Sequence, residues 1–416
     1  MPAACAAKGS SARVWPIPRA TPPDRLRTAG DYNSDTHFNL IAFVATTLTI
    51  TQTVVASGFA AAFVVGALSQ RSNFCTLGAL SDIVNMGDWG RMRMWLLAIA
   101  VAIVGAQALH YAGLIDLGKA FYTRPNFTWL SYAVGGLMFG VGMTLASGCG
   151  SKTLLRMGGG NAKSIIVFAF LAISAYMTMR GLFGVWRVNS LDLAVVDLAS
   201  KGVATQDVPT LLQSAFGLDR KQGILIVSGA VAAALLVFIF KDSEFRRNVD
   251  GILAGSAWGM AVTLGWYVTG HVGYGENPDT LETVFFGTNS RTLESMTFVA
   301  PYAFLLELLM LWSDKSLGLT FGIATVLGLF SGALVYALAT RSWRPEGFTQ
   351  VGDLRNHIIG GVLMGFGGVT AMGCTIGQGV TGVSTLALGS FIALAGIVAG
   401  CVATLKFQYW RMMREG

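Results

Sequence analysis

Long apolar runs dominate the chain, and short polar segments separate them. A helix rises about 1.5 Å per residue, so about 20 consecutive apolar residues cross the hydrocarbon core of a bilayer. By this criterion the sequence predicts about nine transmembrane helices, at residues 38–69, 89–113, 130–148, 161–184, 222–240, 249–271, 317–340, 356–373 and 385–409. We therefore expect an all-α integral membrane protein whose solvent is the lipid bilayer.

Other apolar stretches are too short or too polar to cross the membrane. They lie at residues 73–87, 150–159, 296–313 and 375–384. Irregular backbone at membrane depth is tolerated only where protein or a watery cavity surrounds it. The pattern therefore predicts about four short re-entrant helices in the interior of the protein.

A glycine pattern that ends in cysteine occurs twice. Residues 135–149 read GGLMFGVGMTLASGC and residues 360–374 read GGVLMGFGGVTAMGC, at an offset of 225 residues. Five predicted spans separate the two starts, and an odd number inverts the second copy. The sequence thus predicts two inverted-topology repeats, at 38–240 and 249–416, with a site where they meet. A single membrane glycine more often serves helix packing, but repetition around a cysteine favours a site.

Composition supports the membrane class, since 53% of residues are hydrophobic and only 12% are charged, against about 25% in soluble domains. The net charge of +7 comes from Lys and Arg spread over short loops, so we expect no nucleic-acid partner. Residues 1–37 are polar and rich in Pro and Arg, which predicts a disordered N-terminal tail.

The loops on one side of the predicted spans are richer in Lys and Arg than those on the other. The positive-inside rule then places the C-terminus in the cytoplasm and the N-terminus outside, in a bacterial cytoplasmic (inner) membrane. The arginine-rich tail argues against this orientation, because such segments resist export.

Three of the five cysteines occupy comparable positions. Cys75, Cys149 and Cys374 each stand where a predicted span gives way to a re-entrant stretch. A glycine-rich break exposes backbone amides, and the start of a half-helix favours an anion. A thiol is polarizable and a weak hydrogen-bond donor, which suits a soft sulfur atom. The combination points to an anion that carries sulfur.

Neighbouring residues complete the candidate site. The predicted substrate-binding residues are Cys75, Cys149, Cys374, Arg71, Asn73, Gly148, Gly373, Lys152 and Gln378. The basic side chains could attract the anion or could serve only as topology determinants. The cysteines have no CxxC pair and no Cys/His spacing suited to zinc, so we expect no metal site and no cofactor. Glu307 lies in an apolar stretch and could couple a proton or lie at an interface.

The sequence resembles the YeeE/YedE family of membrane proteins, which is associated with thiosulfate uptake. The resemblance runs from about residue 54 to the C-terminus and is carried by QRSNFC, ASGC, ESMTFVAP and the second GC segment. It implies an hourglass-shaped, inverted-repeat fold in which Cys75, Cys149 and Cys374 pass thiosulfate inward. It also implies a small soluble sulfur-carrier protein as a partner on the cytoplasmic side.

Other functions remain open at this stage. The cargo could be another sulfur or selenium species, or the protein could be a membrane sulfurtransferase that forms a cysteine persulfide. No acid–base pair flanks the cysteines in the sequence, so we predict no catalytic residue and no enzyme. A passive scaffold would have no need of repeated broken helices. The N-terminal extension and the segment at 185–221 have no assigned role.

Overall fold

The computed structural model describes residues 34–217, 219–277, 281–348 and 350–415, with side chains from Ile50 onward apart from Phe216 and Glu415. Residues Thr47–Gly416 form one compact unit. The predicted disordered tail at 1–37 lies almost entirely outside the described residues.

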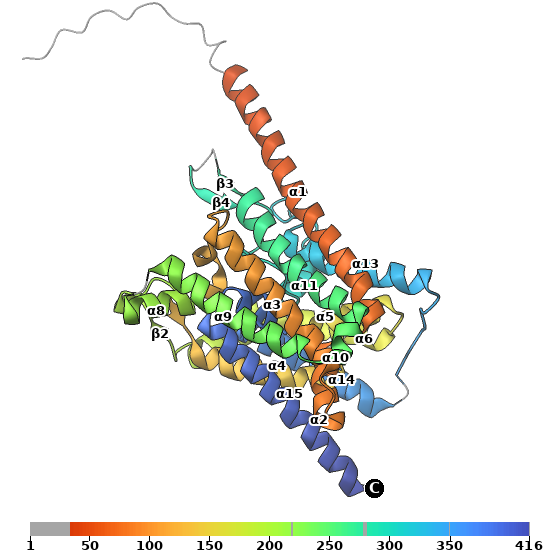
Figure 1. Cartoon of the computed structure of the whole chain (residues 1–416). Coiled ribbons are helices and arrows are strands. Elements are labelled where there is room, and N and C mark those ends of the chain that lie inside the picture. The colour runs from red at the N-terminus through yellow and green to blue at the C-terminus, as the bar shows by residue number, and fades with distance from the viewer. Residues whose placement is uncertain (1–33, 218, 278–280, 349, 416) are drawn as a thin grey trace, which may run out of the picture. The chain divides into compact units, whose positions relative to one another are not determined.

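The described part of the chain is mainly helical (Figure 1). Its α-helices are α1 (Ser34–Ser72), α2 (Thr76–Met86), α3 (Gly90–Tyr111), α4 (Trp129–Leu145), α5 (Gly150–Gly158), α6 (Ala162–Arg180), α7 (Leu182–Ser190), α8 (Val208–Phe216), α9 (Arg220–Phe240), α10 (Ser243–Arg247), α11 (Val249–Tyr267), α12 (Ala300–Met310), α13 (Phe321–Ala339), α14 (Val351–Thr370) and α15 (Leu388–Glu415).

Short elements lie between these helices. The 3₁₀ turns are η1 (Leu117–Lys119), η2 (Phe121–Thr123) and η3 (Ala199–Lys201), and the π-helical turns are η4 (Val268–Val272) and η5 (Gly377–Gly382). Two antiparallel strand pairs join β1 (Asn126–Phe127) to β2 (Val196–Asp197) and β3 (Tyr274–Glu276) to β4 (Thr283–Phe285). The segment at 185–221 therefore contains α8 and the β2 strand as well as connecting chain.

Among the described residues, eight helical segments are long and apolar enough to cross a membrane. They are Ile50–Met86, Gly90–Tyr111, Trp129–Gly158, Ala162–Arg180, Arg220–Phe240, Val249–Val272, Phe321–Ala339 and Leu388–Arg414. The expected all-helical membrane class is confirmed at this level. The predicted span at 356–373, which is not among these eight, corresponds to α14; this helix has 20 residues but carries Asp353, Arg355 and His357 near its start.

The repeated glycines bring helix backbones into direct contact. Helices α4 and α15 run side by side (Figure 1), and a Cβ added at Gly140 would lie 2.2 Å from the Ile397 carbonyl oxygen. A Cβ at Gly400 would lie 2.2 Å from the Leu137 oxygen, and one at Gly367 would lie 2.6 Å from the Gly135 oxygen. Small residues at such crossings permit the close packing that stabilises helices in lipid. These glycines thus allow α14 and α15 to pack closely against α4.

We expect Gly140→Leu to destabilise the protein, because no flexible side chain can move to admit the new atoms. Overpacking typically costs about 1–3 kcal/mol, and more where the backbone must shift. The thermal midpoint of the detergent-solubilised protein should fall clearly. Gly229→Leu on α9 is the matched control, because nothing lies within 4 Å of its added Cβ. Equal midpoints for the two variants would contradict this packing role.

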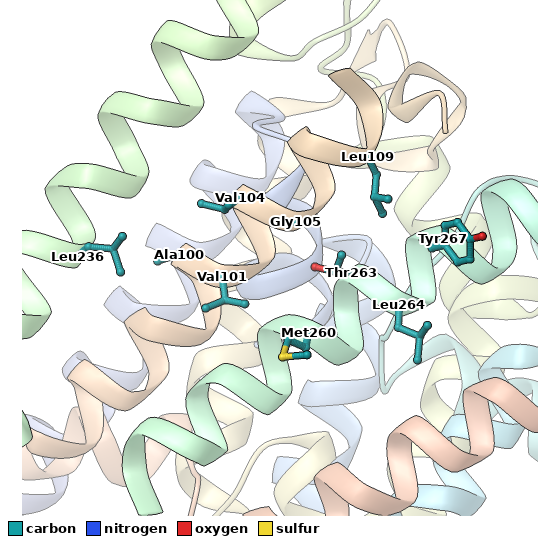
Figure 2. A pocket seen from close by; sticks show the side chains of 10 residues that line it. All are labelled: Ala100, Val101, Val104, Gly105, Leu109, Leu236, Met260, Thr263, Leu264 and Tyr267. Carbon is teal, nitrogen blue, oxygen red and sulfur yellow. The ribbon is translucent and has the colours of Figure 1, made fainter. Parts of the chain in front are cut away.

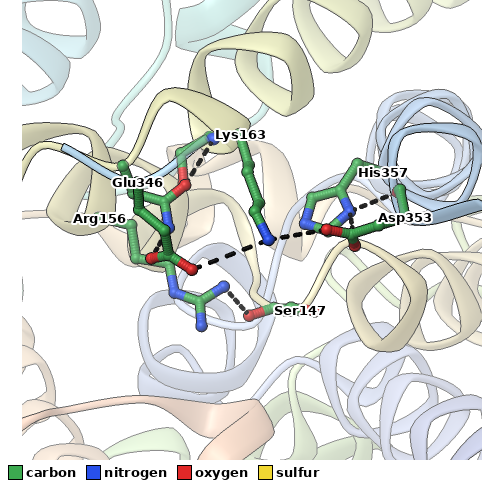
Figure 3. Close-up of polar contacts among 8 residues, drawn as sticks. Ser147, Arg156, Lys163, Glu346, Asp353 and His357 are labelled. Atoms are coloured by element: carbon green, nitrogen blue, oxygen red, sulfur yellow. Dashed lines mark hydrogen bonds and ion pairs between the residues drawn. The ribbon is translucent and has the colours of Figure 1, made fainter. Parts of the chain in front are cut away.

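Polar contacts fasten the segment before α14 to the turn between α5 and α6 (Figure 3). The Lys163 ammonium lies 2.7 Å from an Asp353 carboxylate oxygen, and the Asn161 amide donates to Glu346 at 2.5 Å. The Arg156 guanidinium donates to the Ser147 carbonyl at 2.7 Å. The first two contacts join parts of the chain 185 and 190 residues apart, and the third is local and lies beside the first cavity described below.

Candidate functional site

The backbone breaks in the same way before each of the three candidate cysteines. Asn73, Ser147 and Met372, each two residues before a cysteine, have φ angles of 54°, 57° and 58°. In each case the next amide donates back five residues, from Phe74 to Ser69, from Gly148 to Met143 and from Gly373 to Gly368. This is the hydrogen bond of a Schellman helix end. Positive φ is uncommon for residues other than glycine, so three such breaks mark a shared construction.

Each cysteine then begins a new helical turn. The Gly78 amide donates to the Cys75 sulfur at 3.3 Å, and the Gly377 amide donates to the Cys374 sulfur at 3.3 Å. The Cys149 sulfur lies 3.3 Å from the Ser151 hydroxyl oxygen. In Cys75 and Cys374 the sulfur takes the place of the oxygen that usually caps a helix N-terminus, whereas the Cys149 side chain makes no capping bond to a backbone amide. The thiols therefore lie at the positive ends of short helices, where an anion is favoured.

A basic cavity of about 590 Å³ opens at Cys75. Arg91, Lys152 and Arg156 line it together with Asn73. Asp82 holds the Arg91 guanidinium at 2.5 Å, whereas Lys152 has no carboxylate within ion-pair distance among the described residues. The Lys152 ammonium lies within electrostatic reach of the Cys75 and Cys149 sulfurs. The cavity can therefore hold an anion beside a thiol.

A second cavity of about 390 Å³ lies at the opposite end of α4. Ser147, just after α4, lines the basic cavity, whereas Arg124, shortly before α4, lines the second one. The 17 residues of α4 span about 25 Å, which separates the two cavities across the protein. The second cavity also contains Glu294 and reaches Gly373, the residue before Cys374.

Cys149 and Cys374 are buried, with 1% and 0% of their surfaces exposed, and neither lines one of these two cavities. Cys149 lies close enough to both Cys75 and Cys374 for electrostatic interaction. The Tyr302 hydroxyl donates to the Gly150 carbonyl at 2.6 Å and fixes the turn after Cys149. Cys149 is thus within interaction range of both other candidate thiols, and Cys401 is within the same range of Cys75 and Cys149.

Polar side chains without a protein partner gather near Cys374. The Tyr122 hydroxyl, the Thr375 hydroxyl and the Gln378 carbonyl oxygen are buried and have no hydrogen-bond partner in the protein. A Cβ at Gly377 would lie 3.5 Å from the Tyr122 hydroxyl oxygen and 2.4 Å from the Thr297 hydroxyl oxygen. Because buried polar groups are normally satisfied, these atoms are available to a polar ligand.

The candidate residues from the sequence do not all line the same cavity. Cys75, Asn73 and Lys152 line one cavity, and Gly373 lines the other. Gly148 packs near the Lys152 side chain, because its added Cβ would lie 3.3 Å from a Lys152 carbon. The Gln378 side chain is fully buried and donates to the Ala371 carbonyl at 2.5 Å.

Arg71 lies elsewhere. Its guanidinium pairs with Asp250 at 2.8 Å, and it lines a smaller cavity of about 190 Å³ that shares Arg91 with the basic cavity. Two residues that the sequence reasoning missed, Arg91 and Glu294, line the main cavities. The only sequence signal for Glu294 is its place at the start of ESMTFVAP, one of the quoted motifs.

A third hollow, of about 550 Å³, is apolar and lies between α3, α9 and α11 (Figure 2). Val104, Leu236 and Met260 line it, and Val104 and Met260 are exposed on the protein surface. It contains no charged side chain, so it does not suit an anion. Among the described residues, no three His, Cys, Asp or Glu side chains come together to hold a metal ion.

Eight helical segments able to cross a membrane, with two cavities that contain charged side chains, define a multi-pass membrane protein among the described residues. The chain belongs to the Sulphur transport (YeeE/YedE) family, whose sequence profile matches residues 71–403. It is 27% identical over 375 residues to thiosulfate transporter TsuA of Escherichia coli K12, covering 87% of this chain and 97% of that protein. It is 24% identical over 372 residues to thiosulfate transporter TsuA of Spirochaeta thermophila, covering 83% and 96%. The resemblance seen in the motifs is confirmed.

Proposed function

We propose that this protein takes up thiosulfate, or a closely related sulfur-bearing anion, through constrictions lined by cysteine. The observation that carries the proposal is that Cys75, Cys149 and Cys374 stand at three equivalent backbone breaks, in a part of the protein with two cavities that contain arginine or lysine. The names of the TsuA relatives support the choice of thiosulfate. The anion would exchange weak S–H hydrogen bonds from one thiol to the next.

The topology that goes with this function is also a proposal. In it α14 is the ninth span, while α2, α5, α12 and η5 are re-entrant, and residues 38–240 and 249–416 are inverted repeats. The equal break geometry before Cys149 and Cys374 supports the repeat. The positive-inside rule puts the cavity that contains Arg91, Lys152 and Arg156 on the cytoplasmic side of a bacterial inner membrane, with the C-terminus inside and the N-terminus outside.

Import of a dianion has an energetic requirement. Each elementary charge moved against 100 mV costs about 2.3 kcal/mol, so thiosulfate entering an inside-negative cell costs about 4.6 kcal/mol. Rapid removal of the arriving anion would offset part of this cost. A small soluble sulfur-carrier protein on the cytoplasmic side is our proposed partner for that step, and the family resemblance supports it.

Uptake of radiolabelled thiosulfate into liposomes that contain the purified chain tests the function. We expect uptake to saturate and unlabelled thiosulfate to compete, whereas sulfate should compete poorly because it lacks a terminal soft sulfur. Competition by selenium analogues would rank the related anions by how strongly they inhibit uptake. Equal competition by sulfate would contradict thiol-based selection. Intact-mass measurement after exposure should show no added sulfur atom, and a stable adduct would favour a sulfurtransferase instead.

A further inference from the structure

Glu294 is a buried carboxylic acid that the transport proposal does not use. It lies in the segment between β4 and α12, outside the membrane-spanning helices, and only 8% of its surface is exposed. The Ser290 hydroxyl donates to one carboxylate oxygen at 2.7 Å, and the other oxygen has no partner in the protein. The Thr269 hydroxyl donates to the Glu294 carbonyl at 2.5 Å and fixes the backbone. The side chain forms part of the wall of the 390 Å³ cavity.

The charges around this cavity leave Glu294 without a counterion. No Lys, Arg or His lies within ion-pair distance of its carboxylate among the described residues. Arg124 and Arg187 line the same cavity, but Arg187 pairs with Asp192 at 3.1 Å. The Tyr122 phenol is close enough to interact electrostatically with Glu294. The polar groups near Glu294 that can influence its titration are therefore Arg124, Arg187, Tyr122 and the hydroxyl of Ser290.

Glu307, the other carboxylate singled out in the sequence, differs from Glu294 in this respect. Its carboxylate lies 3.5 Å from the Arg180 guanidinium and so has a cationic partner. Burial without such a partner raises the pKa of Glu294 to about 7, despite the hydrogen bonds from Ser290 and Asn289. Glu294 can therefore exchange a proton near neutral pH.

An anion in the second cavity would meet this carboxylate. The ionised form repels an anion, whereas the protonated form has no charge and offers an O–H donor. We propose that Glu294 takes up one proton from solution when the anion binds in the second cavity, so that this cavity is a joint site for a proton and a sulfur-bearing anion. The inference rests on the proposed transport function. No bond of the anion breaks, and the proton is transferred from water to the carboxylate.

The coupling between proton binding and anion binding fixes the direction in which the affinity for the anion changes with pH. Since binding requires the protonated form, affinity is highest at acidic pH, where the free protein already carries the proton. It should fall as the pH rises through the pKa of Glu294, by about tenfold per pH unit on the alkaline side, which is the limit for one linked proton. The reciprocal statement also holds, because bound anion raises the proton affinity of the site.

Calorimetric titration of the full chain with thiosulfate tests the proposal. Measurements at pH 8 in buffers of different ionisation enthalpy count the protons taken up. We expect close to one proton per anion for the wild type and none for Glu294→Gln, whose affinity should not depend on pH. Glu307→Gln is the control and should retain the proton uptake of the wild type. Binding by the wild type without proton uptake, or unchanged proton uptake in Glu294→Gln, would overturn the inference.

A second variant keeps the test valid if Glu294→Gln folds poorly. Ser290→Ala removes a hydrogen bond to the ionised carboxylate, so the pH at which affinity begins to fall should move upward. An unchanged or lowered midpoint would contradict the role of Glu294. If the wild type bound no thiosulfate at any pH, the transport proposal would fail first, which is a result distinct from binding without a proton.

Discussion

Replacing Cys149 or Cys374 with alanine should reduce thiosulfate uptake at least tenfold, a change that corresponds to about 1.4 kcal/mol. Both thiols are buried, and each substitution removes a polarizable group from the proposed route of the anion. Initial uptake rates in liposomes, normalised to the amount of folded protein, measure the effect. Cys149→Ser should be intermediate, because its hydroxyl keeps a donor but is less polarizable.

Cys401→Ala is the matched control for these variants. Cys401 is also a free and fully buried cysteine, but it lies within α15 and does not follow a backbone break. We expect its uptake to equal that of the wild type. If Cys149→Ala and Cys374→Ala transported normally, the proposed thiol series would have to be abandoned, whatever the cargo.

The second large effect is expected from Lys152→Gln. Two unit charges 4 Å apart interact by about 4 kcal/mol at an effective dielectric constant of 20, so removal of this charge beside Cys75 should raise the KM about tenfold even after solvent screening. The difference from wild type should shrink as salt is added, because the screening length falls to about 10 Å at 0.1 M. Uptake kinetics at low and high ionic strength provide the measurement.

Arg71→Gln tests whether the cavity or the sequence-based list of candidates better predicts which basic residues attract the anion. Arg71 was predicted beside Lys152, yet its guanidinium is paired with Asp250 in a smaller cavity. We expect its KM to stay within about twofold of wild type, as is usual for substitutions away from a site. A rise as large as that for Lys152→Gln would show that general surface charge, and not the Cys75 cavity, attracts the anion.

The sequence predicted the positions of the short helices closely, whereas their re-entrant character stays a prediction. The expected re-entrant stretches at 73–87 and 150–159 correspond to α2 (Thr76–Met86) and α5 (Gly150–Gly158), and 296–313 contains α12 (Ala300–Met310). Length and glycine content are local properties, so they can be read directly along the chain. The stretch at 375–384 contains the π-helical turn η5 instead of a regular half-helix, and π-helical turns are rare and frequently occur at functional sites.

Contacts between distant parts of the chain could not be predicted in this way. The pairing of Arg71 with Asp250, the bond between Asp82 and Arg91, and the joint presence of Arg124 and Glu294 in one cavity all depend on how the helices pack. The strand pairing of β1 with β2, which ties the chain near residue 126 to the segment at 185–221, is of the same kind. Hydropathy contains no information about such partners.

The amide bonds to sulfur also affect how fast an ion could pass. The first-turn amides of Gly78 and Gly377 already donate to Cys75 and Cys374 before any anion arrives. An anion that binds to one of these amides must displace the cysteine sulfur as the hydrogen-bond acceptor. The gain in binding free energy is therefore only the difference between two similar hydrogen bonds. Weak binding at each thiol permits rapid release of the anion. Fast transport requires that no binding position along the pathway hold the anion strongly.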